Sequence, residues 1–383
     1  MGVYLDYNAT TPIDKRVLDY MVEVYTNKFG NADSRTHDYG DNARKIVEQA
    51  RKSVANLLSV NSTEVFFTSG STESSNIAIR GLIDYANSVG KKHVITTSIE
   101  HKAVLETVKS LKKDGFSIDI VNPEIDGRVS ASRILDLVRD DTLLVSVMHA
   151  NNETGIIQPI DLLGETLASR DVFFHVDATQ SCGKLVEELR NTKYDMLSLS
   201  AHKFNGPQGI GALVLKKKKY KLPPIKAITY GGQQEHGIRP GTIPVALVAG
   251  LGKACEIAAA EYKTNYDHCL EIKNVVKKII EDSGLEYEYN GDQNYCMPNT
   301  INVSFNGIES EALMLSSKQY CGVSNGSACT SNDYSPSYVL TAMGIDKDKI
   351  SSAIRISWGA DSDLDDVKKN IKELLTVAKG LVF

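Results

Sequence analysis

The stretch SLSAHKFNGPQGIG, residues 198–211, places one lysine, Lys203, between two apolar segments. The residues before it, YDMLSLSAH, and after it, IGALVL, have the composition of buried strands, and NGPQG has the composition of a tight turn. A lysine at the end of an apolar strand usually returns its ammonium group to water. A lysine kept in a buried position instead loses its charge readily and can act as a nucleophile. The neighbouring segments favour the second alternative.

Short β-rich segments alternate with helical periods from about residue 64 onward. Several are apolar on both faces, as in a mostly parallel sheet covered by helices. The segments are EVFFTS, HVITTS, SIDIVN, LLVSVMHA, VFFHVDA and MLSLSAH. Beyond about residue 260 the pattern changes to α+β. We therefore predict a large α/β domain over residues 13–259 and a smaller domain formed by residues 1–12 and 260–383; the first dozen residues could instead cross to another subunit.

The composition of the 383-residue chain excludes several classes of protein. Its formal net charge of −5 argues against binding nucleic acid over a broad face, because phosphate binding needs clustered cations. No apolar segment at the N-terminus or elsewhere indicates export or a membrane span, so we expect a cytoplasmic enzyme. The six cysteines show no CxxC spacing, so neither a metal site nor a disulfide framework is predicted.

Small and hydroxyl-bearing residues, Gly70-Ser71-Thr72-Glu73, follow EVFFTS and open a helix. Free backbone N–H groups and the positive end of the helix dipole suit such a segment to phosphate binding. The same residues also fit an ordinary helix cap formed by Ser69 or Ser71. The segment lacks the lysine of a P-loop, so it does not indicate a nucleoside triphosphate.

Polar residues follow three further predicted strands, at the edge where an open parallel sheet binds ligands. They are His101, Asn151 and Asn152, Asp177, and Gln180. Taken singly, each has an ordinary explanation as a cap, a turn or a hydrogen-bonded carboxylate. An aspartate at the end of a buried strand nevertheless requires a cation or hydrogen-bond donors.

Together with Lys203, these residues specify a ligand with four chemical features. The ligand needs a phosphate, a ring that stacks on an imidazole, a cationic ring nitrogen to pair with Asp177, and an aldehyde to react with the lysine. Pyridoxal 5′-phosphate (PLP) has all four. The sequence therefore predicts a PLP enzyme.

The chain resembles the cysteine desulfurases, which are fold-type I PLP enzymes of the aminotransferase class V group. Ten motifs carry the resemblance over nearly the full length: YLDYNATTP from residue 4, FGN, TSGSTESSN, EHKAV, HANNETG, HVDATQSCGK, SAHKFNGPQGIGAL, GIRPGT, SNGSACTS and RISWG from residue 355. The resemblance implies a large domain with a mostly parallel seven-stranded sheet covered by helices. It also implies a smaller α+β C-terminal domain that carries a catalytic cysteine.

The resemblance also assigns roles to individual residues. Lys203 would hold PLP as a Schiff base, Asp177 would keep the ring nitrogen protonated, and His101 would stack on the ring and assist proton transfer. Gln180, and Asn152 in preference to Asn151, would contact the face of the ring and the side that carries its phenolic oxygen. The phosphate would be held by Ser71, Thr72, Ser200 and His202. In related enzymes the hydroxyl that matches Thr242 reaches the phosphate across a dimer interface, which implies a homodimer.

Two further residues select the reaction. Arg355, which we expect to follow a strand, has a guanidinium fork that matches the carboxylate of an amino-acid substrate; the alternative is a surface ion pair.

Cys329 lies among small polar residues, and Pro336 is expected to begin the next helix. A cysteine in such a loop can be a nucleophile, whereas Cys182 and Cys255 have apolar settings. The implied reaction converts L-cysteine to L-alanine and leaves a persulfide on Cys329 for an acceptor protein.

Three departures from the commonest pattern bear on the subtype: Ala32 after Gly30-Asn31, Gln233, and Trp358. GNADSRTHDYG together with SNGSACTS is similar to desulfurases of DNA phosphorothioation. The alternatives are a general sulfur donor for iron–sulfur clusters or tRNA thiolation, a selenocysteine lyase or aminotransferase of the same fold, and a non-catalytic scaffold.

Overall fold

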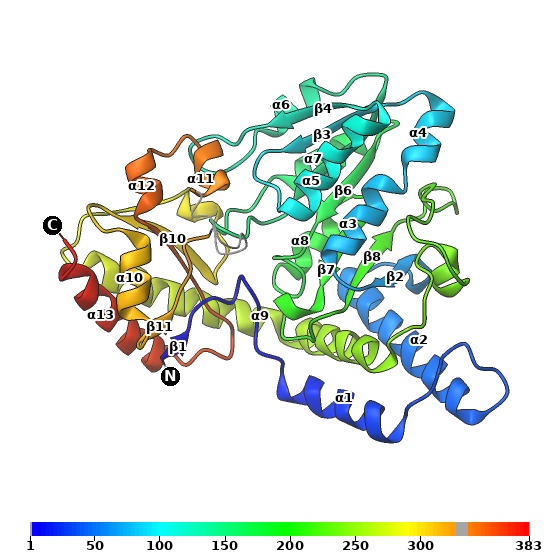
Figure 1. The fold of residues 1–383 in the computed structure, drawn as a ribbon, viewed down its shortest axis with the longest axis horizontal. Helices are drawn as coiled ribbons and strands as arrows, with labels where there is room; N and C mark the ends of the chain where they lie inside the picture. Colours follow the sequence, from blue (N-terminus) through cyan, green and yellow to red (C-terminus); the bar gives the residue numbers. More distant parts are fainter. Residues whose placement is uncertain (1, 327–335, 383) are drawn as a thin grey trace.

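The computed structural model describes residues 2–326 and 336–382, which form a large and a small unit (Figure 1). The large unit contains a seven-stranded sheet in the order β2-β8-β7-β6-β5-β3-β4, and it is parallel except for β8, which is antiparallel to both β2 and β7. The strands are β2 (Val65–Thr68), β3 (His93–Thr97), β4 (Ser117–Val121), β5 (Thr142–Met148), β6 (Phe173–Asp177), β7 (Met196–Ser200) and β8 (Gly211–Leu215). The predicted mostly parallel seven-stranded sheet is confirmed.

Helices cover both faces of this sheet because its central strands are apolar on both sides. Adjacent side chains of β2 show the division: Phe66 packs in one apolar cluster with Ile77, and Phe67 packs in the other with Ala254. The first cluster includes residues of α3 (Ser71–Arg80), α4 (Ile83–Val89) and α5 (Lys102–Ser110). The second includes α1 (Lys15–Asn27), α2 (Asp38–Leu58), α6 (Ala131–Asp136), α7 (Ile160–Leu167), α8 (Val186–Asn191) and the first part of α9 (Val245–Glu281).

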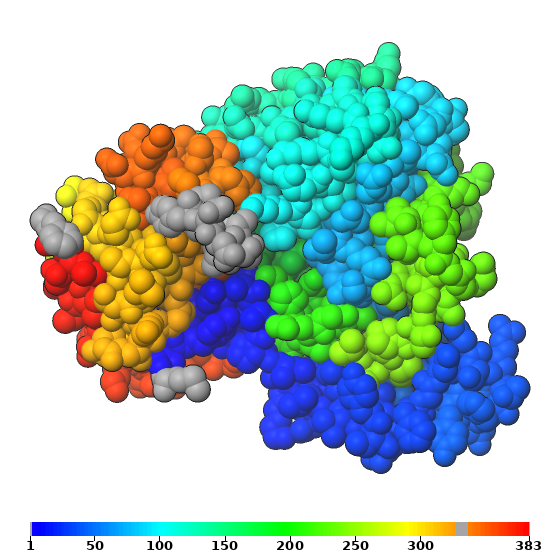
Figure 2. All heavy atoms as spheres, viewed as in Figure 1, coloured from blue at the N-terminus to red at the C-terminus, as the bar shows by residue number. Residues whose placement is uncertain are grey.

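The small unit is built on an antiparallel sheet of order β12-β10-β9, and the fully buried Trp358 lies in its core. Its elements are β9 (Tyr287–Tyr289), β10 (Thr300–Phe305), α10 (Ser310–Ser317), β11 (Cys321–Gly322), α11 (Tyr338–Ala342), α12 (Lys347–Ser351), β12 (Ala353–Ser357) and α13 (Leu364–Lys379). The N-terminal strand β1 (Val3–Tyr4) pairs in parallel with β11 of this unit. Figure 2 shows the N-terminal segment, in dark blue, between the two units.

The 37-residue helix α9 joins the two units (Figure 1). Its residues up to Ala258 pack in the core of the large unit, and those from Cys269 onward pack in the core of the small unit. The predicted boundary at residue 260 therefore falls inside a continuous helix, and the division into two domains remains a prediction. Within the described ranges, no helix has the length and apolar character that a membrane span requires.

Candidate active site

A cavity of about 470 Å³ lies at the ends of the central strands. Its wall brings together residues that are far apart in the sequence: Asn8, Ala9, Ser71, Thr72, His101, Asn152, Asp177, Thr179, Gln180, Ser200, His202, Lys203 and Arg355. All the predicted site residues are among them except Thr242 and Cys329. Thr242 is exposed and does not line this cavity, and Cys329 lies outside the described residues.

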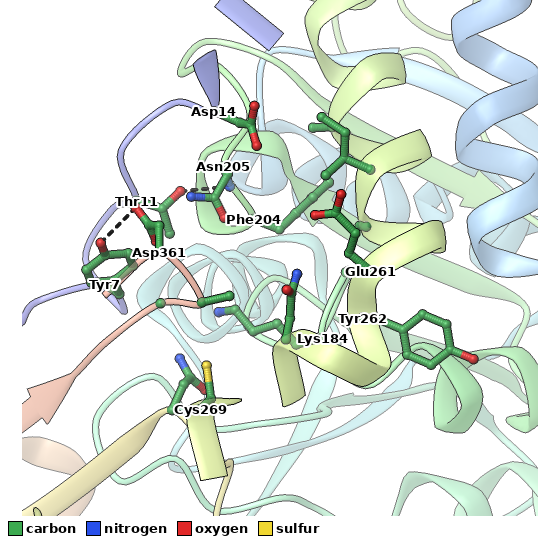
Figure 3. A pocket seen from close by; sticks show the side chains of 18 of the residues that line it. Tyr7, Thr11, Asp14, Lys184, Phe204, Asn205, Glu261, Tyr262, Cys269 and Asp361 are labelled. Atoms are coloured by element: carbon green, nitrogen blue, oxygen red, sulfur yellow. Dashed lines mark hydrogen bonds between the residues drawn. The ribbon is translucent and has the colours of Figure 1, made fainter. Parts of the chain in front are cut away.

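Figure 3 shows a neighbouring cavity of about 260 Å³, with Lys184 and Cys269 labelled. Lys203 lines both cavities. Lys184, Cys269 and Trp358 are on the wall of the smaller cavity, but Asp177 and the helix terminus at Ser71 are not. The larger cavity therefore has the groups that a phosphate and a cationic ring require, and the smaller one lacks them.

The start of helix α3, where the sequence predicts a phosphate site, lines the larger cavity. Gly70 precedes the helix with φ of +154°, and a Cβ there would lie 3.3 Å from the Ser200 hydroxyl. The Ser71 N–H donates to the Ser200 Oγ over 2.7 Å. Gly70 caps the helix without a side-chain hydrogen bond, so neither Ser69 nor Ser71 acts as the ordinary cap that was the alternative. The geometry suits an anion.

His202 and Thr72, the second residue of α3, also line this cavity. The Nδ1 of His202 is 3.0 Å from the Oγ1 of Thr10, and burial lowers the pKa of His202 to about 4. The imidazole is therefore neutral at physiological pH and contributes hydrogen bonding rather than charge. Thr72 is exposed at the mouth of the cavity.

Asp177 ends strand β6 and is 3 % exposed. Its Oδ1 accepts hydrogen bonds from the N–H and the hydroxyl of Thr179 and, over 3.4 Å, from the hydroxyl of Ser71. No described residue donates to Oδ2. One carboxylate oxygen is thus held in place while the other can accept a hydrogen bond from a protonated ring nitrogen.

Lys203 lies on a 3-10 turn, η3 (Ala201–Lys203), between β7 and β8. Its Nζ donates to the carbonyl oxygens of Asn8 and Ala9, each over 2.7 Å. Because the side chain borders both cavities, it is half-buried rather than fully buried, so that part of the sequence-based expectation is wrong. Lys203 nevertheless lines the same cavity as Asp177 and the start of α3.

His101 caps α5, because its Nδ1 accepts the N–H of Ala103 over 3.1 Å, and it also lines the cavity. The capping role and the functional role that the sequence left open are therefore compatible. Burial, assisted by the charge of Lys203, lowers the pKa of His101. A neutral ring whose Nδ1 accepts a hydrogen bond carries its proton on Nε2.

Two amide side chains have unpaired oxygens at the cavity. The Gln180 Nε2 donates to the Asn8 carbonyl over 2.9 Å, whereas its Oε1 has no partner among the described residues. The Asn152 Oδ1 is likewise buried and unpaired there. Asn151, by contrast, holds its own turn, because its Oδ1 accepts the N–H groups of Glu153 and Thr154 over 2.9 and 3.0 Å. The structure thus places Asn152 rather than Asn151 at the cavity.

Arg355 lies inside strand β12, not after a strand as we expected from the sequence. Its Nη1 donates to the carbonyl of Asn152 over 2.8 Å, and its Nη2 donates to the Oδ1 of Asp6 over 2.6 Å. The residue is only 4 % exposed, so the alternative of a surface ion pair is wrong. A buried guanidinium that faces the cavity is suited to a carboxylate.

The five described cysteines are all buried: Cys182, Cys255, Cys269, Cys296 and Cys321. Burial raises the pKa of each thiol, to about 12 for Cys182 and for Cys321. A thiol with a raised pKa is a poor nucleophile at neutral pH. The apolar settings expected for Cys182 and Cys255 are confirmed.

The residues that flank the undescribed segment meet at one carboxylate. The Ser337 hydroxyl donates to the Oε2 of Glu153, and Gly326 lies so close to this oxygen that a Cβ there would be 2.7 Å from it. Burial raises the pKa of Glu153 to about 7. Ser337 also caps α11, so the helix begins at Tyr338 and not at Pro336 as we expected.

Sequence reasoning missed several residues of this site. The motif YLDYNATTP was noted, but no role was assigned to Asp6 or to the carbonyls of Asn8 and Ala9. Thr179, which supports Asp177, stands inside a quoted motif and could have been found from its spacing of two residues. Glu100, next to His101, is buried with a pKa raised by burial to about 8; it accepts the Thr97 hydroxyl over 2.7 Å.

Comparison with known proteins places the chain in a family. The family model of aminotransferase class-V matches residues 3–369. The cysteine desulfurase IscS of Vibrio cholerae serotype O1 is 44% identical over 362 residues, which cover 94% of this chain and 88% of that protein. A solved NifS-like protein matches with a TM-score of 0.91 at 36% identity, over 100% of both chains. DndA from Streptomyces lividans matches with a TM-score of 0.81 at 39% identity, over 93% of this chain and 99% of that chain.

This chain therefore belongs to the aminotransferase class V family, as its motifs predicted. Within that family, the named relatives that it resembles include cysteine desulfurases, in agreement with the resemblance drawn from the sequence.

Proposed function

We propose that this protein is a PLP-dependent cysteine desulfurase that converts L-cysteine to L-alanine and passes the sulfur, through a persulfide on Cys329, to an acceptor protein. The similarity to the IscS desulfurases over nearly the whole chain supports this activity. One structural observation carries it: Lys203, Asp177 and the start of α3 converge on a single cavity.

The residues of the cavity fit PLP. The Oδ2 of Asp177 is available to a protonated ring nitrogen, and the unpaired oxygens of Asn152 and Gln180 can receive donors from a bound group. Thr72, Ser200 and His202, with the backbone at Ser71, would hold the phosphate. Lys203 would hold the aldehyde carbon. When bound, PLP supplies an electron-accepting ring that stabilises negative charge on the substrate.

The chain's own residues would then perform the chemistry. Arg355 would bind the substrate carboxylate, and the amine of Lys203, once released, would take the proton from the α-carbon, with His101 as the neighbouring proton carrier. The Cys329 thiolate attacks the substrate sulfur, so an S–S bond forms as the Cβ–S bond breaks. The electron pair of that bond would stay on the substrate β-carbon, which takes up a proton; the α-carbon regains the proton that Lys203 removed, and L-alanine leaves.

Two observations support a homodimer. Helix α1 buries Val17, Met21 and Val24, yet its opposite face exposes Leu18, Val22 and Tyr25, which are 43%, 51% and 58% exposed. An apolar face of this kind on an edge helix fits a second copy of the chain. The exposed Thr242 would then complete the phosphate site of the partner.

The identity of the acceptor separates two pathways. The IscS relatives favour a general sulfur donor for iron–sulfur assembly, whereas the match to DndA and the GNADSRTHDYG segment favour phosphorothioation of DNA. The acceptor that removes sulfur from the persulfide fastest, an iron–sulfur scaffold or a phosphorothioation protein, decides between them.

The activity is tested by removing the proposed nucleophile. We expect Cys329→Ala to keep the absorbance of bound PLP but to form no alanine from L-cysteine in the absence of an added thiol. Cys321→Ala, which alters a buried cysteine, is the control and should form alanine. Mass spectrometry of the wild-type protein after one turnover should find one extra sulfur atom on the Cys329 peptide. Alanine formation by Cys329→Ala at the wild-type rate would contradict the proposal.

A further inference from the structure

Asp6 forms an ion pair with Arg355, the residue that we propose binds the substrate carboxylate. Its Oδ1 lies 2.6 Å from the Nη2 of Arg355, and the two side chains are 20% and 5% exposed. The position of Asp6 is fixed by the backbone, because Asp6 forms a β-bridge with Ser357 and its carbonyl accepts the Tyr4 hydroxyl over 3.0 Å. A carboxylate of the protein therefore already occupies part of the proposed carboxylate site.

The guanidinium group of Arg355 uses only some of its N–H donors for contacts within the described residues. Nη2 donates to Asp6 and Nη1 donates to the carbonyl of Asn152, so the guanidinium is held from two sides. Its Nε is buried and has no partner among the residues that the structure describes. An arginine has five N–H donors, so a second carboxylate can still bind. It would bind beside the charge of Asp6, which repels it.

We propose that Asp6 is a positioning residue that holds Arg355 in place and weakens its attraction for the substrate and product carboxylates. This inference rests on the proposed function, because it takes Arg355 as the carboxylate site. Substrate and product carry the same carboxylate, so Asp6 weakens the binding of both. The effect is on ground-state affinity and on alanine release, not on the bond-breaking step.

Substitution Asp6→Asn separates position from charge. The amide keeps an oxygen that can accept from Nη2, but the negative charge is gone. We expect the KM for L-cysteine and the inhibition constant of L-alanine each to fall roughly three- to tenfold, the size of effect that one neighbouring charge produces. We expect kcat to stay the same or fall, because alanine leaves more slowly. A merely structural role would lower kcat and raise KM.

Two controls make the outcome decisive. Asp361→Asn removes a carboxylate that accepts the Tyr7 hydroxyl over 3.0 Å and does not contact Arg355, so the KM for L-cysteine and the inhibition constant of L-alanine should remain unchanged.

Arg355→Gln tests the underlying assignment of the carboxylate site, because it should weaken L-alanine binding. If Arg355→Gln leaves alanine binding unchanged, the proposed carboxylate site is wrong. If it weakens binding but Asp6→Asn does not tighten it, the role of Asp6 is wrong. Asp6→Ser provides a second uncharged variant in case Asp6→Asn does not fold.

Discussion

The two units of the molecule contribute to the site in different ways. The large unit supplies the proposed cofactor side, with Asp177 at the end of one parallel strand and Lys203 in the turn after the next, and the sequence marks both strands clearly. The small unit and the N-terminal segment supply the proposed substrate side, where Arg355 in mid-strand meets Asp6 from the other end of the chain. Cofactor chemistry is thus built from local strand-end loops, and substrate recognition is built from contacts between distant segments.

The largest effect should come from a change on the cofactor side. Asp177→Asn removes the charge that pairs with the ring nitrogen and keeps the size of the side chain. We expect kcat to fall roughly 100-fold or more, within the range that a positioned proton-handling group contributes, and the absorbance of bound PLP to change. Steady-state kinetics and absorption spectra measure both effects. Wild-type kcat with an unchanged spectrum would contradict the proposed division between the units.

The fold was predictable from the sequence because the sheet is buried on both faces. Apolar segments such as LLVSVMHA at β5 indicate a parallel strand without any knowledge of its neighbours. The site residues after these strands followed from the rule that ligands bind at the carboxyl ends.

The remaining contacts were not predictable for a physical reason. The pair between Asp6 and Arg355 depends on how β1 pairs with β11 and how β12 lies in its sheet, and no local pattern encodes that geometry. The same holds for the carbonyls of Asn8 and Ala9, because a backbone oxygen leaves no signal in residue type.

The smallest effect should come from Glu100, whose Oε1 accepts the N–H of Met148, a residue of the cavity wall, over 2.9 Å. Burial raises its pKa from the ordinary value of 4.5 to about 8, so between these values the folded chain holds a proton that the unfolded chain has lost. The free energy of unfolding contributed by this group therefore falls as pH rises through that window. Glu100→Gln removes this contribution.

We accordingly expect the stability of Glu100→Gln, relative to wild type, to increase from pH 5 to pH 8.5 in urea unfolding. Glu106→Gln, at an exposed position on α5, is the control. Parallel stability curves for wild type and Glu100→Gln across this range would show that Glu100 ionises normally in the folded protein.

The central claim is that Lys203 carries PLP, and borohydride reduction of the purified protein with PLP tests it most directly. Reduction fixes a Schiff base as a stable bond, so peptide mass spectrometry reveals the lysine that formed it. We predict the label on Lys203, its loss in Lys203→Ala, and its retention in Lys184→Met, which changes the lysine of the neighbouring cavity. A label on Lys184, or no label on the wild-type protein, would contradict the account.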